Sequence, residues 1–157
     1  MKIEFVPRTF KILRGTILLI AVVLLAYVAY AATTLTINNS GTVVNVSANL
    51  FASLGQTSTT TCSSTTTPAY SDTGLSITSW SVTVGQSQSL FACLENTGTA
   101  LHTLSITGAG FPAGVAFSSP QNAATIGANG FLLATFILTA SSGATVGSFT
   151  GATITIA

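Results

Sequence analysis

The stretch AYVAYAATTLTINNSGTVVNVSANL, from Ala26 to Leu50, decides the fold because its character changes in the middle. Up to Ala32 it is apolar and typical of a segment that enters a membrane. From Thr33 it is polar and rich in β-branched residues, which is typical of strands. If the apolar part is cleaved off, the new N-terminus is a free strand.

The residues before this boundary have the pattern of an export signal. The basic residues end at Arg14, an apolar run extends from Ile17 to Ala32, and Ala29 and Ala31 are spaced as in a signal-peptidase site. The run is longer than a usual signal core and shorter than the roughly 20 residues that span a bilayer as a helix. Residues 1–32 are therefore predicted to be an apolar helical signal peptide or a retained membrane anchor.

A third interpretation uses the dipeptide Arg14-Gly15, which resembles the cleavage site of type IV prepilins. A type IV pilin keeps its apolar segment as a long helix in the filament core. In this chain the helical pattern ends by Ala32, because the following residues are β-branched and then reach the breaker Asn39-Ser40-Gly41. The pilin interpretation is therefore the least favoured of the three.

The body of the chain is almost uncharged. All four basic residues lie in the first fourteen positions, and only Asp72 and Glu95 carry a carboxylate beyond them. Serine and threonine are abundant and supply hydroxyls where a soluble domain normally carries charge. A nearly neutral surface associates unless something else solvates it, so we expect glycosylation or burial in an assembly. A nucleic-acid partner is excluded, because phosphate binding requires clustered Lys and Arg.

From residue 33 onward the sequence predicts strands and turns. The run ATITI at the C-terminal end alternates strictly, residues 131–138 are apolar on both faces as in a central strand, and the parity changes near Thr78-Ser79, which indicates a bulge. About seven strands emerge, which predicts an all-β chain, an immunoglobulin-like antiparallel β-sandwich. The expected core residues are Trp80, Leu90, Leu104, Ile106, Leu133, Phe136 and Ile154.

The order of several motifs resembles a known group. These are an apolar leader ending in YAA, then TTLTINNSGTVVNV, SITSWSVTVGQSQSL, LENTGTALHTLSITG and FLLATFILTASSGATVGSFTGATITI. The combination is similar to small secreted immunoglobulin-like proteins of archaea, the group that includes the subunits of archaeal thread filaments. The resemblance implies an extracellular homopolymer used for surface adhesion, in which the N-terminal strand of each subunit fills a groove in the next.

The positions that would match such a donor strand are residues 33–47, followed by a sandwich domain over residues 48–157. Fifteen extended residues reach about 50 Å, and strand addition needs alternating apolar side chains. The expected donor side chains are Leu35, Ile37, Val44 and Val46. The alternative is that the same residues form the first strands of their own domain, in a monomeric surface domain anchored by residues 17–32.

Catalytic chemistry is not expected. The body offers one imidazole and two carboxylates, which is too few for paired acid–base groups or for a specific metal site, and no cofactor is implied. His102 shares the parity of Leu104 and is predicted to end a core-facing row. Asp72 and Glu95 precede Thr-Gly and Asn-Thr-Gly and are predicted to be solvated turn residues.

Short patterns predict one disulfide and two N-glycosylation sites. Cys62 and Cys93 are the only cysteines, and two thiols in an exported chain are best explained by one disulfide. Asn38 and Asn45 each begin an N-x-Ser sequon, and Asn45 is expected on the solvent face of its strand if Val44 and Val46 face inward. The threonines between Gln56 and Tyr70 are open to two interpretations, as carriers of O-linked glycans or as a flexible loop.

Overall fold

The computed structural model describes residues 20, 36–45, 47–73 and 75–157. The chain divides into two units, Met1–Leu35 and Thr36–Ala157. Of the first unit only Ile20 is described, so the predicted leader with Ala29 and Ala31 lies outside the described residues, as do Leu35 and Val46. The described residues include no helix with the length and apolar character needed to cross a membrane.

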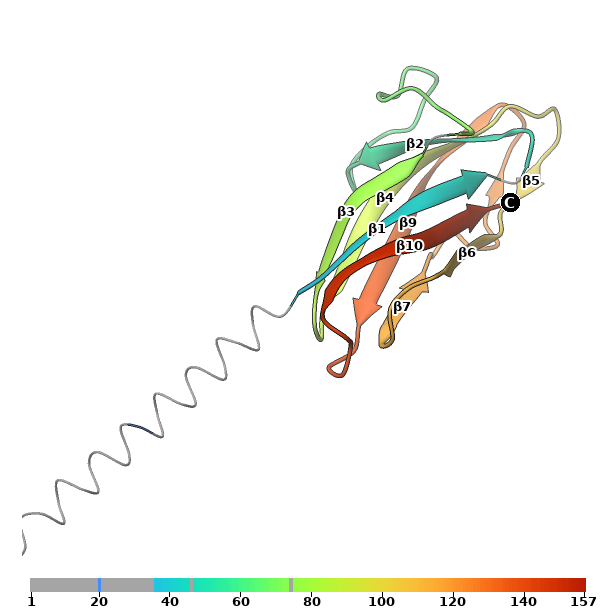
Figure 1. Ribbon diagram of the computed structural model, residues 1–157. Coiled ribbons are helices and arrows are strands. Elements are labelled where there is room, and N and C mark those ends of the chain that lie inside the picture. The colour runs from blue at the N-terminus through green and yellow to red at the C-terminus, as the bar shows by residue number, and fades with distance from the viewer. Residues whose placement is uncertain (1–19, 21–35, 46, 74) are drawn as a thin grey trace, which may run out of the picture. The chain divides into compact units, whose positions relative to one another are not determined.

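The unit that begins at Thr36 is all-β, with strands and turns and no helix in its described part. The ten strands in this described part form three sheets, with orders β3-β1-β10-β6, β2-β4-β9-β7 and β5-β8. Figure 1 shows the two four-stranded sheets as layers, one behind the other. The strands are β1 Thr36–Asn45, β2 Leu50–Gln56, β3 Ser76–Thr83, β4 Ser87–Asn96, β5 His102–Thr103, β6 Ile106–Ala109, β7 Val115–Ser118, β8 Thr125–Ile126, β9 Gly130–Ala140 and β10 Gly147–Ile156.

One hydrophobic core joins the two four-stranded sheets. Phe136 on β9 and Ile154 on β10 belong to the same buried cluster, although their strands lie in different sheets. In β10 the residues Ala152, Ile154 and Ile156 are buried and alternate with half-buried threonines, as the sequence predicts. This period of two places every second side chain on the core face of the sheet.

Most of the expected core residues are buried. Trp80, Leu104, Ile106, Phe136 and Ile154 have 0–3% of their surface exposed. Leu90 is half-buried and packs against the same cluster. Leu133 is different, because it lies opposite Cys93 on the other face of the sheet and is only half-buried there.

The predicted central strand and the predicted bulge are both confirmed. β9 lies between β4 and β7 and carries apolar residues on both faces. In the pairing of β1 with β3, Asn39 lies opposite Trp80 and Gly41 opposite Ile77, so Ser40 faces two unpaired residues, Thr78 and Ser79. β1 therefore continues through residues 39–41 without a turn, and the extra residue of the bulge lies on β3.

Gly41 lies at this bulge, where β1 approaches β10 closely. A Cβ atom on Gly41 would collide with the carbonyl oxygen of Ala152 and lie 2.9 Å from its carbonyl carbon. Because both obstacles are backbone atoms, the two strands would have to separate locally. Only a residue without a side chain allows this approach.

We predict that Gly41→Ala lowers the free energy of unfolding by about 1–3 kcal/mol, as overpacking does elsewhere. Urea denaturation followed by tryptophan fluorescence measures this loss, since Trp80 is the only tryptophan. Gly143→Ala is the matched control, because a Cβ atom there meets nothing within 4 Å. Equal midpoints for both variants would contradict the close approach of β1 to β10.

Candidate functional site: the first strand and the loop held by the disulfide

The first strand lies inside its own sheet. β1 pairs in parallel with β10, from Ile37 opposite Gly147 to Asn45 opposite Ile156, and antiparallel with β3 on its other side. Figure 1 shows β1 between these two strands. The donor-strand interpretation places this segment in the sheet of a neighbouring subunit, whereas in this single chain it has the alternative arrangement, as a strand of its own domain.

The expected inward residues of this strand are corrected at one position. Val43 is buried in the core, whereas Val44 has 40% of its surface exposed. From Asn39 to Gly41, β1 advances by two residues while β3 and β10 each advance by three, so the extra residues lie on the neighbouring strands. The alternation of β1 therefore continues through Ser40, and it places Val43 instead of Val44 on the core face. The backbone of Ile37 pairs with Val82 and Gly147, and its side chain lies outside the described residues, as do Leu35 and Val46.

The two sequons lie on β1 or overlap its end. The backbone of Asn38 is opposite Ser81 and Ser148, and that of Asn45 is opposite Ile156. Both asparagine side chains lie outside the described residues. The premise that placed Asn45 on the solvent face was that Val44 faces inward, and this premise is wrong.

The predicted disulfide is present. Cys62 and Cys93 are bonded with a Cα–Cα distance of 5.5 Å. Cys93 lies on β4 and is fully buried, and Cys62 lies in the loop between β2 and β3. The bond therefore fixes this loop to the middle of a sheet.

Hydrogen bonds attach the same loop at further points. The Ser53 hydroxyl donates to the Pro68 carbonyl at 2.5 Å, and the Gln56 amide donates to the Thr67 carbonyl at 3.1 Å. Ala52 and Ser71 exchange two backbone hydrogen bonds of 2.9 Å. The Tyr70 ring lies 5.7 Å from the Phe131 ring of β9. These contacts favour a fixed conformation over the flexible interpretation.

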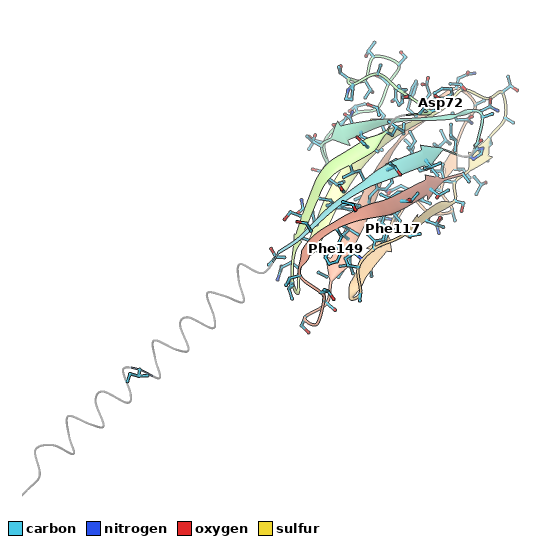
Figure 2. The ribbon with its side chains drawn as sticks, in the orientation of Figure 1. Asp72, Phe117 and Phe149 are labelled. Carbon is cyan, nitrogen blue, oxygen red and sulfur yellow. A yellow bond between two sulfur atoms is a disulfide. The ribbon has the colours of Figure 1, made fainter. Side chains whose placement is uncertain are left out.

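The histidine, aspartate and glutamate of the described part lie on separate elements. His102 is half-buried on β5, and its Nε2 is buried without a hydrogen-bond partner among the described residues. Asp72 is exposed near the end of the β2–β3 loop, as expected (Figure 2). Glu95 is not a turn residue; it lies within β4, opposite Phe51 and Phe131. Within the described residues no group of His, Cys, Asp or Glu could hold a metal ion.

Asn96 is a structural residue that sequence reasoning missed. It is 1% exposed, and its side-chain amide donates to the carbonyls of Ala100, Ile126 and Gly127 at 2.8–3.2 Å. Its side-chain oxygen accepts the Gly98 amide at 2.9 Å. A buried amide that satisfies all these groups fixes the β4–β5 loop against β8. The Asn-Thr-Gly turn pattern was the available signal.

A groove of about 560 Å³ lies along β6 and β7 at one side of the two sheets. At this side the rings of Phe111 and Phe117 stack 5.7 Å apart, and the Trp80 ring is edge-on to both. Figure 2 labels Phe117, which comes from β7. Gly108 makes room for these rings, because a Cβ atom there would lie 2.5 Å from Phe117. The rings thus close this side of the core.

The phenol of Tyr70 has a shifted pKa. Burial raises this pKa above its ordinary value of 10.0, the hydroxyl of Thr66 lowers it, and the charge of Glu95 raises it. A raised folded-state pKa contributes stability that is present below the ordinary value and is lost as pH rises through the folded pKa.

We therefore predict that the urea midpoint of the chain falls as pH is raised above the ordinary tyrosine value. In Tyr70→Phe this decrease should be smaller, because the variant lacks the phenol whose ionisation is opposed by burial beside Phe131 and by the charge of Glu95. Parallel denaturation curves at neutral and alkaline pH test this. Identical pH profiles for the two proteins would show that the Tyr70 phenol ionises equally easily in both states.

No protein-family model, curated protein or solved structure matches the chain.

Proposed function

We propose that the chain is an exported, non-enzymatic surface domain of immunoglobulin-like architecture, in which the first strand completes its own sheet. The observation that carries this proposal is the pairing of β1 with β3 and β10 within one chain. A chain that fills this position itself needs no neighbour to cover the edges of β3 and β10. Adhesion at the cell surface is the role that suits such a domain.

Three features support an extracellular location. The segment from Ile17 to Ala32 has the composition of a signal or anchor. The disulfide between Cys62 and Cys93 is of the kind that persists in oxidising compartments. The outward-facing residues are largely Ser, Thr and Gly, with few charges, which suits a surface that is glycosylated or packed among other molecules.

The second candidate function is a filament subunit that exchanges its first strand. One observation favours it: β1 lies between two other strands, so its departure would open a groove with two unpaired edges. A neighbour's β1 could then fill this groove. Such contacts are head-to-tail and generate an open filament, which would serve adhesion as the resemblance to archaeal threads implies.

A cysteine cross-link separates the two candidates. Thr42 on β1 and Ser76 on β3 are exposed cross-strand partners, so Thr42→Cys with Ser76→Cys places two thiols side by side. The native cysteines are already bonded to each other. The proposed function predicts that the oxidised surface protein migrates as a monomer on a denaturing, non-reducing gel.

Strand exchange predicts a covalent ladder instead, because the thiol introduced on β1 of one subunit would bond to the thiol introduced on β3 of the next. The control is Ser87→Cys with Thr139→Cys, whose hydroxyls lie 2.8 Å apart on β4 and β9 and which should cross-link within one chain in either case. A ladder in the first variant alone would overturn the monomeric proposal in favour of the filament. A chain that antibodies reach only after cell lysis would overturn both.

A further inference from the structure

The loop between β2 and β3 contains two copies of a six-residue unit. Residues 57–62 read TSTTTC and residues 63–68 read SSTTTP. Each unit begins with a four-residue turn, in which the first and fourth residues exchange hydrogen bonds. Thr57 N–H donates to Thr60 Oγ1 at 3.0 Å and Thr60 N–H donates to the Thr57 carbonyl at 3.1 Å. Ser63 and Thr66 repeat the two bonds at 2.9 and 3.1 Å.

The hydroxyls at positions one, three and four of each unit are engaged. The Thr57 hydroxyl lies 3.2 Å from that of Thr59 and 3.1 Å from that of Thr60. In the second unit the Ser63 hydroxyl lies 3.0 Å from that of Thr65, and the Thr66 hydroxyl accepts from Tyr70 at 3.3 Å. These contacts use the hydroxyls to hold each turn together.

The sixth residue of each unit is tied to a sheet. Cys62 is bonded to Cys93 on β4, and the Pro68 carbonyl accepts the hydroxyl of Ser53 on β2. The two turns are therefore fixed at equivalent points. Side chains that project from this loop therefore point in fixed directions.

Positions two and five are the exception in both units. Ser58, Thr61, Ser64 and Thr67 are all exposed, and none of their hydroxyls has a hydrogen-bond partner among the described residues. The repeat therefore divides its hydroxyls into an engaged set that builds the turns and an unengaged set that faces solvent at regular spacing.

We propose that these four hydroxyls are attachment sites for O-linked sugars. The inference rests on the export proposed above, because export brings the loop to a glycosyltransferase. An unengaged, exposed hydroxyl can enter a transferase without breaking the fold, whereas modifying an engaged one would remove a bond that holds its turn. A sugar on this loop also supplies the solvation that the weakly charged surface lacks.

The reaction is a glycosyl transfer from a sugar phosphate donor. The serine or threonine Oγ attacks the anomeric carbon, so that a new C–O bond forms while the bond from that carbon to the phosphate oxygen breaks. The hydroxyl proton goes to a base of the transferase, and the phosphate leaves with the electron pair. No oxidant or reductant is required.

The test measures the intact mass of the protein purified from its own cells. The loop variant combines Ser58→Ala, Thr61→Val, Ser64→Ala and Thr67→Val. The control variant combines Ser142→Ala, Thr145→Val, Ser148→Ala and Thr150→Val, which are also exposed and whose hydroxyls are also unengaged among the described residues. Since none of these hydroxyls holds the fold, both variants should keep the urea midpoint of the parent.

We expect the parent and the control variant to exceed their sequence masses by whole sugar units, and the loop variant to lose the part of that excess that alkaline β-elimination removes. Alkaline β-elimination releases sugars from Ser and Thr but not from Asn, so the mass it removes cannot come from Asn38 or Asn45. The residues at which elimination occurs should be the four loop positions. An excess that alkaline β-elimination still removes from the loop variant, or elimination at the engaged residues, would overturn the inference.

The same preparation distinguishes this inference from the proposed function. A chain that is accessible on intact cells and has the mass of its sequence overturns the inference and leaves the surface role standing. An unmodified chain found only inside cells overturns both.

Discussion

Phe136→Ala is expected to lower the free energy of unfolding by about 3–5 kcal/mol, the loss typical of removing a buried phenyl ring. Phe136 is fully buried at the centre of β9 and lies 6.2 Å from the Phe117 ring. Truncation to alanine removes its contacts with both sheets and leaves a cavity. Because domains of this size are stable by about 5–15 kcal/mol in total, the variant should unfold at much lower urea.

Ile137→Ala is the matched control for this prediction. Ile137 is the next residue along β9, so it points to the opposite face of the sheet, where it is half-buried. Its truncation should shift the urea midpoint clearly less than Phe136→Ala. If the two variants lose equal stability, the core does not lie on the face of β9 described here.

The second large effect is expected on removing the disulfide. Cys62→Ser opens a loop with a sequence separation of 31 residues, and the chain-entropy model predicts a loss of about 3–4 kcal/mol for a loop of this length. The loss arises mainly in the unfolded state, which becomes less restricted. The dependence of the unfolding free energy on urea should therefore also become steeper.

A reducing agent provides the control for this experiment. The reduced parent should behave as Cys62→Ser does, whereas the variant itself should not respond to reduction, since its remaining thiol has no partner. A variant within about 1 kcal/mol of the oxidised parent, far below the range of the loop-closure model, would show that the loop is already restricted when unfolded.

The sequence predicts the strands well where burial alone decides them. In β10 isoleucine alternates with threonine, so the isoleucines face the core and the threonines face away from it. β9 is apolar on both faces, which suits a central strand of the sheet. The cysteine pairing follows in the same way, because only one pair exists. Each of these features depends on a few residues that allow a single arrangement.

The first strand shows why the rest could not be predicted. Val43 and Val44 are adjacent and equally apolar, and Val43 is buried because the alternation of β1 continues unbroken through Asn39-Ser40-Gly41, where the sequence pattern indicates a break. The sequence also does not predict whether β1 pairs within its own sheet or in a neighbour's, because main-chain hydrogen bonds form in the same way with either partner. The six-residue repeat of the loop is present in the sequence, but only the structure shows which of its hydroxyls bond to one another and which face solvent.

The parallel pairing of β1 with β10 has a mechanical consequence. Thr36 begins its strand near the start of β10, and Ala157 follows the end of β10 beyond Asn45. A force that pulls Thr36 away from Ala157 therefore acts along both strands and loads the hydrogen bonds between them together, in shear. Strands loaded in this way cannot peel apart one bond at a time, so the domain resists tension best along the direction in which its chain enters and leaves.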